Sequence, residues 1–147
     1  LLTDIMGFEH VGEYGGRLRF RTDEHEVGSI VDLRSAGSGA RVYMGRGSVH
    51  HVAFRARDDE EQQSWRETIT NAGIPVTTVQ DRCYFHSIYF HEPGGVLFEI
   101  ATDTPGFGID ESEEELGRKL QLPPWFESRR EKLEAQLPRL VLPDERS

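Results

Sequence analysis

The 147-residue sequence is poor in cysteine, in lysine and in long apolar runs, and each shortage excludes a class of protein. Because Cys83 is its only cysteine, the chain forms no internal disulfide, which is compatible with a reducing compartment. No stretch approaches the roughly 20 apolar residues that a membrane-spanning helix needs. We therefore expect a cytoplasmic globular protein with no membrane partner.

Positive charge is also scarce. The sequence contains 26 acidic and 17 basic residues, which gives a formal net charge of −9. Nucleic acids and anionic membranes bind basic surfaces, so this balance argues against both as partners. A chain of this length buries roughly two thirds of its unfolded surface, which suits one compact domain.

Residues 1–46 are predicted to be the C-terminal remnant of a structural unit, followed by a loop. The first six residues are predicted to be the last turns of a helix that ends at Gly7. Three short strands follow, and a Gly-Gly pair marks a hairpin between the first two: residues 8–14, 17–22 and 29–33. Because a domain rarely begins inside a helix, we expect further chain upstream of Leu1.

Residues 47–103 predict a complete β-α-β-β-β module. Asp58 opens the helix with Glu61 three residues later, which is a capping-box pattern; Trp65 lies inside the helix and Gly73 ends it. The predicted strands are residues 49–56, 74–79, 84–91 and 96–102. Residues 104–147 are predicted to be an acidic loop and a helical tail, with a helix at 127–137. The expected fold is α+β, with repeated βαβββ modules that form an open curved sheet and a truncated N-terminus.

Strand alternation selects two candidate metal ligands. Successive side chains of a strand point to opposite faces, so His51 lies on the face opposite to Phe54, which should pack on the helix. In the last strand, Glu99 is an acid among apolar residues. A buried carboxylate needs a partner, and a metal ion is one such partner.

Structural roles without a metal remain open for both residues. A single strand histidine is usually a hydrogen-bonded core residue. An inward-pointing glutamate is more often paired with an arginine, here Arg82 or Arg55. The placement of His51 and Glu99 on the first and last strands of one module favours the metal hypothesis, and the structural roles stay open as alternatives.

Three sequence strings resemble the vicinal oxygen chelate superfamily, which includes glyoxalases, bleomycin resistance proteins and extradiol dioxygenases. They resemble more narrowly its hydroquinone-type ring-cleaving dioxygenases. The strings are GSVHHVAF at 47–54, DRCYFHSIYF at 81–90 and EPGGVLFEIATD at 92–103. The resemblance is strong over residues 47–109 and weaker on either side of them.

The resemblance implies that His51 and Glu99 are ligands of a ferrous ion. It also implies that His50 lies next to the metal as an acid–base group, that Arg82 lies near the site and that Tyr89 contacts the substrate. In such enzymes a third ligand, another histidine, comes from an N-terminal module. No residue here matches that histidine, and His10 and His25 lie in the wrong part of the repeat.

The expected function is therefore the C-terminal portion of a non-haem Fe(II)-dependent dioxygenase of aromatic catabolism, which cleaves hydroquinone-like rings with O₂. One alternative is a glyoxalase-like lyase or isomerase that uses Mn, Zn or Ni. Another is a non-catalytic ligand-binding domain of the bleomycin-resistance type. We expect a homo-oligomer, or pairing with a missing N-terminal half, because one module lacks its first strand.

Overall fold

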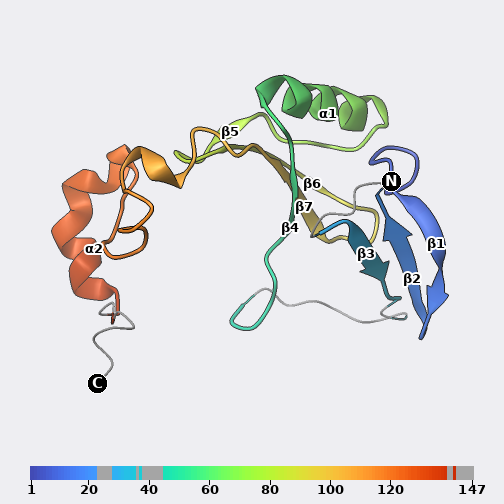
Figure 1. The fold of residues 1–147 in the computed structure, drawn as a ribbon, viewed down its shortest axis with the longest axis horizontal. Coiled ribbons are helices and arrows are strands. Elements are labelled where there is room, and N and C mark those ends of the chain that lie inside the picture. The colour runs from blue at the N-terminus through green and yellow to red at the C-terminus, as the bar shows by residue number, and fades with distance from the viewer. Residues whose placement is uncertain (23–27, 36, 38–44, 139–140, 142–147) are drawn as a thin grey trace.

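A computed structural model describes residues 1–22, 28–35, 37, 45–138 and 141, and its strands form two open sheets (Figure 1). One sheet has three strands: β1 (Glu9–Tyr14), β2 (Arg17–Arg21) and β3 (Ile30–Leu33). The other has four: β4 (Val52–Arg55), β5 (Gln80–Asp81), β6 (His86–His91) and β7 (Leu97–Ala101). The predicted α+β class with open sheets is confirmed.

The three-stranded sheet is antiparallel throughout, in the order β1-β2-β3. Gly15 and Gly16 connect its first two strands with φ values of 57° and 74°. Glycine adopts these left-handed values without steric cost, so the predicted hairpin forms. One face of the sheet places Phe20 and Val31 against the hydrophobic core of the neighbouring sheet.

The first six residues are not a helix, contrary to the prediction. They form a hydrogen-bonded turn in which the N–H groups of Ile5 and Met6 both donate to the carbonyl of Leu1 at 3.0 Å. The Phe8 N–H then donates to the Leu2 carbonyl at 2.9 Å across Gly7, whose φ is 72°. Gly7 thus has the expected C-terminal geometry, but the short segment does not contain the repeated i to i+4 bonds that define a helix.

The four-stranded sheet and its helix follow one another along the chain in the order β-α-β-β-β. Its strand order is β4-β7-β6-β5, with β4 parallel to β7 and the other pairs antiparallel. The helix α1 (Asp59–Asn71) connects β4 to β5. As predicted, Asp58 caps α1, because its carboxylate accepts a hydrogen bond from the Glu61 N–H at 2.8 Å.

The core lies between α1 and one face of this sheet, which Figure 1 shows beneath the helix. Ile69 of α1, Ile88 of β6 and Ile100 of β7 are buried there. Trp65 is partly buried and packs against this core, as the sequence predicts. The opposite face of the sheet carries the side chains of the alternate positions and is not covered by the helix.

The strand predicted at residues 74–79 forms only in part. Val76 makes an isolated bridge with Phe90, and β5 begins later. Thr77 causes the interruption, because its hydroxyl accepts the Tyr89 N–H at 3.0 Å and its carbonyl accepts Arg66 Nε at 2.9 Å. These side-chain bonds replace part of the backbone ladder.

The C-terminal segment extends away from both sheets as an arm (Figure 1). It contains the 3₁₀ helices η1 (Phe107–Ile109) and η2 (Pro124–Arg129) and the helix α2 (Arg130–Gln136). The predicted single helix at 127–137 is therefore wrong over its first three residues, which belong to the 3₁₀ turn. Arg129, at ψ 9°, is the last residue of η2 and directly precedes α2. Within the described ranges, no helix is both long and apolar enough to cross a membrane.

Candidate metal centre

Glu99 lies in the middle of β7 on the face that α1 leaves open. Directly beside it in the ladder are Ala53 on β4 and Tyr89 on β6. Residues two positions away on neighbouring strands share the same face, which adds Ser87 and, one residue before β4, His51. The side chain of Glu99 is only 4% exposed, so its carboxylate depends on these neighbours for hydrogen bonds.

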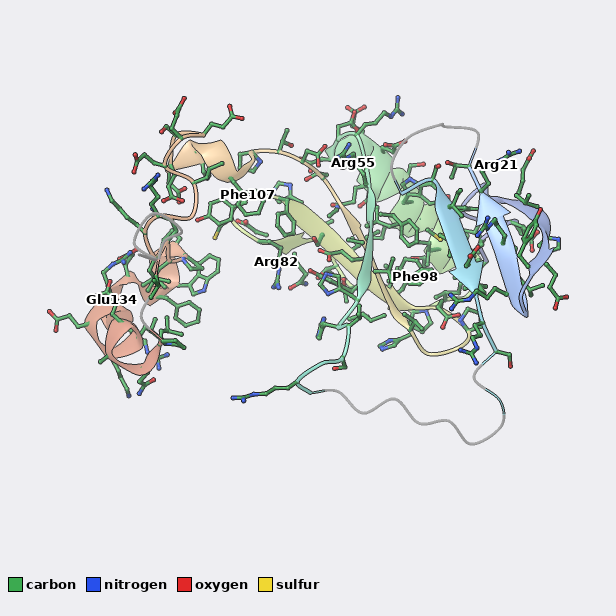
Figure 2. All side chains as sticks on the ribbon, turned by 60° about the horizontal axis from the view of Figure 1, so that its bottom comes forward. Arg21, Arg55, Arg82, Phe98, Phe107 and Glu134 are labelled. Carbon is green, nitrogen blue, oxygen red and sulfur yellow. The ribbon has the colours of Figure 1, made fainter. Side chains whose placement is uncertain are left out.

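The two carboxylate oxygens of Glu99 have different partners. Oε1 accepts hydrogen bonds from the Ser87 hydroxyl and from the Tyr89 hydroxyl, the latter at 2.8 Å. Oε2 lies 2.7 Å from Nε2 of His51. The alternative partners do not reach it: Arg55 pairs with Asp103 at 3.0 Å, and Arg82 lies over the Tyr89 ring. Figure 2 shows the two arginines coming from opposite edges of the sheet.

His51 precedes the first paired residue of β4, because the ladder with β7 begins at Val52. The strand is therefore shorter than predicted, yet the imidazole still points to the open face and reaches Glu99. The second ring nitrogen, Nδ1, lies 2.9 Å from Nδ1 of His50. His50 is exposed and stands outside the ladder, so it joins the site at its rim instead of facing the helix.

Tyr89 and Arg82 complete this face. The guanidinium carbon of Arg82 lies 5.9 Å from the centre of the Tyr89 ring, which is within the range of cation–π attraction. Burial raises the pKa of the Tyr89 phenol above its ordinary value, and the bond to Glu99 raises it further, whereas Ser87 acts in the opposite direction. The phenol is therefore a neutral donor at physiological pH.

The remaining histidines lie elsewhere. The ring of His10 packs against Phe20, with 5.2 Å between the ring centres, and His86 pairs with Asp59 on the helix side at 2.7 Å. His91 is exposed at the end of β6, and His25 lies outside the described residues. In the part of the chain that the structure describes, no three His, Cys, Asp or Glu side chains gather closely enough to hold a metal ion. Among the described residues, the structure thus brings together His51 and Glu99 and no third candidate ligand.

The donor chemistry of His51 and Glu99 fits part of a divalent metal site. Imidazole and carboxylate are the ligands of non-haem iron, manganese and zinc sites. The observed 2.7 Å between Nε2 of His51 and Oε2 of Glu99 is a hydrogen-bond distance, so the two candidate ligands are paired with each other. Sequence reasoning missed Ser87, although alternation within β6 places it on the same face as Tyr89.

The face that carries these residues is open. Two hollows of about 390 Å³ and 270 Å³ lie elsewhere, one beside the start of α1 and one between the N-terminal turn and the end of β6. Neither includes His51 or Glu99.

Comparison with known proteins agrees with the fold and with the sequence strings. The sequence model of the glyoxalase/bleomycin resistance protein/dioxygenase superfamily matches residues 2–100. The chain belongs to this superfamily. The resemblance to vicinal oxygen chelate proteins is thereby confirmed.

Individual relatives are dioxygenases by name. MhqO of Bacillus subtilis strain 168, a candidate ring-cleaving dioxygenase, is 48% identical over 137 residues, which are 93% of this chain and 43% of the relative. A chlorohydroquinone/hydroquinone 1,2-dioxygenase from Sphingobium indicum is 41% identical over 93 residues, which are 61% of this chain and 28% of the relative. The crystal structure of a candidate dioxygenase from Bacillus subtilis superposes with a TM-score of 0.87 at 45% identity, over 95% of this chain and 45% of that one.

The chain spans less than half the length of the relatives that it matches over most of its own residues.

Proposed function

We propose that this chain is the metal-ligating portion of an Fe(II)-dependent ring-cleaving dioxygenase that acts on hydroquinone-like substrates. The observation that carries the proposal is the contact between His51 Nε2 and Glu99 Oε2 on the open face of the sheet. The Glu99 carboxylate is almost fully buried, and a divalent ion bound beside His51 would offset the cost of burying its charge. The names of the relatives suggest aromatic rings as the substrate class.

Each nearby residue has a role in this proposal. His51 and Glu99 would hold the metal, and a bound Fe(II) would supply the redox chemistry that ring cleavage with O₂ requires. Tyr89 donates a hydrogen bond to a substrate oxygen, because its phenol stays neutral. Arg82 stabilises negative charge that develops on the ring oxygen. His50 serves as the acid–base group at the rim of the site.

The third ligand must come from outside the described residues. The relatives are more than twice as long as this chain, and a homologous N-terminal portion is the proposed source of a further histidine. Two protein ligands hold a divalent ion poorly, so the chain by itself should have little activity. This requirement separates the proposal from one in which the chain is a self-sufficient enzyme.

The test compares two proteins: this chain alone, and a chimera in which it replaces the matching 137-residue region of MhqO. Anaerobic Fe(II) titration is followed by O₂-uptake assays with hydroquinone. We expect the chimera to bind iron and consume O₂, and the His51→Ala and Glu99→Ala variants of the chimera to do neither. The His10→Ala variant is the matched control, because His10 packs against Phe20 instead of facing Glu99.

Three results would contradict the proposal. Stoichiometric iron and full turnover in the isolated chain would show that the site is complete without another portion. Tight binding of Mn, Zn or Ni by the chimera, without O₂ uptake, would favour the lyase or isomerase alternative. Binding of an aromatic ligand with no metal requirement would favour a sequestering domain.

A further inference from the structure

We propose that Ser87 is a positioning residue that fixes the Glu99 carboxylate, so that Oε2 alone is presented to a metal ion beside His51. The inference rests on the proposed metal site and adds a residue that determines how the site is built. It depends on the unequal surroundings of the two carboxylate oxygens.

The two oxygens of the Glu99 carboxylate point towards different neighbouring strands. Oε1 is directed towards β6, where the hydroxyls of Ser87 and Tyr89 both donate to it. Oε2 is directed towards β4, where it meets His51 at 2.7 Å. The carboxylate cannot bind a metal ion through both oxygens without losing hydroxyl bonds to Oε1.

Ser87 is suited to a fixed role because it is completely buried, with 0% of its surface exposed. In the ladder it lies opposite Ala101, two residues along β7 from Glu99, so its short side chain is a diagonal neighbour of the carboxylate. A buried hydroxyl needs a partner, and among the described contacts the Ser87 hydroxyl donates to Glu99. Neither group has access to bulk water as a replacement.

Tyr89 differs from Ser87 in a way that makes the two donors complementary. Tyr89 is only partly buried, and the proposed function requires its hydroxyl to reach a substrate oxygen. When Tyr89 turns to the substrate, Ser87 continues to satisfy Oε1 and keeps Oε2 in place. Ser87 is thus the permanent donor and Tyr89 the exchangeable one.

The first test examines the metal-free 147-residue chain, labelled with carbon-13 at the glutamate carboxyl groups. The Glu99→Gln variant assigns the Glu99 resonance. We expect Ser87→Ala to shift that resonance and Ser87→Thr, which keeps a hydroxyl, to restore it. Ser64→Ala, on the exposed surface of α1, is the matched control and should leave it unchanged. An unchanged Glu99 resonance in Ser87→Ala would overturn the inference.

The second test measures Mn(II) binding by electron paramagnetic resonance for the same variants, in the chain and in the MhqO chimera. Loss of a group that orients a ligand typically costs about 10–100-fold in metal affinity, so Ser87→Ala should weaken binding by that factor and Ser87→Thr should recover most of it. Equal affinity in Ser87→Ala and the unaltered protein would also overturn the inference. Absence of Mn(II) binding in every protein would instead count against the proposed function, while the carboxyl resonances still decide the role of Ser87.

Discussion

His51 and Glu99 meet at 2.7 Å although they belong to opposite ends of the βαβββ module. The parallel pairing of β4 with β7 produces this contact, because it places Ala53 directly beside Glu99 and His51 two residues earlier on the same face. The small side chain of Ala53 leaves space through which the imidazole reaches the carboxylate.

The first prediction concerns that space. Ala53→Leu should place a branched side chain between His51 and Glu99 and weaken Mn(II) binding by at least about tenfold, which corresponds to about 1.4 kcal/mol. Because Ala53 is exposed, the free energy of unfolding should change little. Metal titration and urea unfolding of the same samples measure both effects. Ala72→Leu, at the exposed end of α1, is the control, and equal loss of affinity there would contradict the proposed role of this space.

The second prediction concerns Gln62, a buried polar residue on α1. Its side-chain amide donates to the carbonyls of His86 and Ile100, at 2.8 Å and 2.9 Å, and so ties the helix to β6 and β7. Gln62→Leu should lower the free energy of unfolding by about 1–3 kcal/mol, because these donors are lost. Gln63→Leu, on the exposed side of the helix, should be nearly neutral in the same urea titration.

A glutamate at position 62 should make the free energy of unfolding depend on pH. In Gln62→Glu, an ionised carboxylate would face two carbonyl oxygens, whereas the protonated acid can donate to one of them. The folded variant should therefore bind its proton more tightly than the unfolded chain. Its stability should rise relative to Gln62→Leu as the pH falls towards about 4. A constant difference between the two variants across that range would exclude this mechanism.

The third prediction concerns the capping box of α1. The Glu61 carboxylate accepts the Arg57 backbone N–H at 2.6 Å, and this bond is the main cause that lowers the pKa of Glu61 below its ordinary value. A lowered pKa means that the stabilisation is present above the ordinary glutamate pKa and is lost as the pH falls through the folded value. Glu61→Gln should thus be less stable than the unaltered chain at pH 7 by about 0.3–1.5 kcal/mol. The difference should shrink below about pH 4.

Urea unfolding at pH 7 and at pH 3.5 measures this difference. Asp58→Ala, which removes the cap itself, should cost about 1 kcal/mol at pH 7. Glu67→Gln, on the exposed side of the same helix, controls for the loss of one negative charge. If the difference in unfolding free energy between Glu61→Gln and the unaltered chain grew as the pH fell, the hydrogen bond from Arg57 would not be the cause of the lowered Glu61 pKa.

The fourth prediction concerns assembly. In the described part of the chain, no strand pairs with the outer edge of β4, and the adjacent Val49 is 77% exposed. Open strand edges with apolar flanks favour association, so we expect a dimer or higher oligomer in solution. Light scattering across a micromolar dilution series measures the oligomeric state. Val49→Asp should weaken association about tenfold, and Val96→Asp, in the turn before β7, should not; a monomer at every concentration would contradict the prediction.

Sequence reasoning predicted much of the order of strands and helices because that order depends on local signals. The Asp58 cap, the Gly15-Gly16 hairpin and the alternation within β7 each act over a few residues. Element ends were less predictable. The strand expected before Gln80 is interrupted because Thr77 bonds with groups from α1 and β6, and both partners are distant in the sequence.

The candidate site was likewise predictable only in part. Alternation by itself placed His51 and Glu99 on one face, and the sequence strings placed the chain in its superfamily. Only the tertiary structure decided that Glu99 bonds to Ser87 and Tyr89 instead of Arg55 or Arg82. The physical reason is that alternation fixes which face a side chain occupies, whereas strand register fixes which side chains on that face lie within bonding distance.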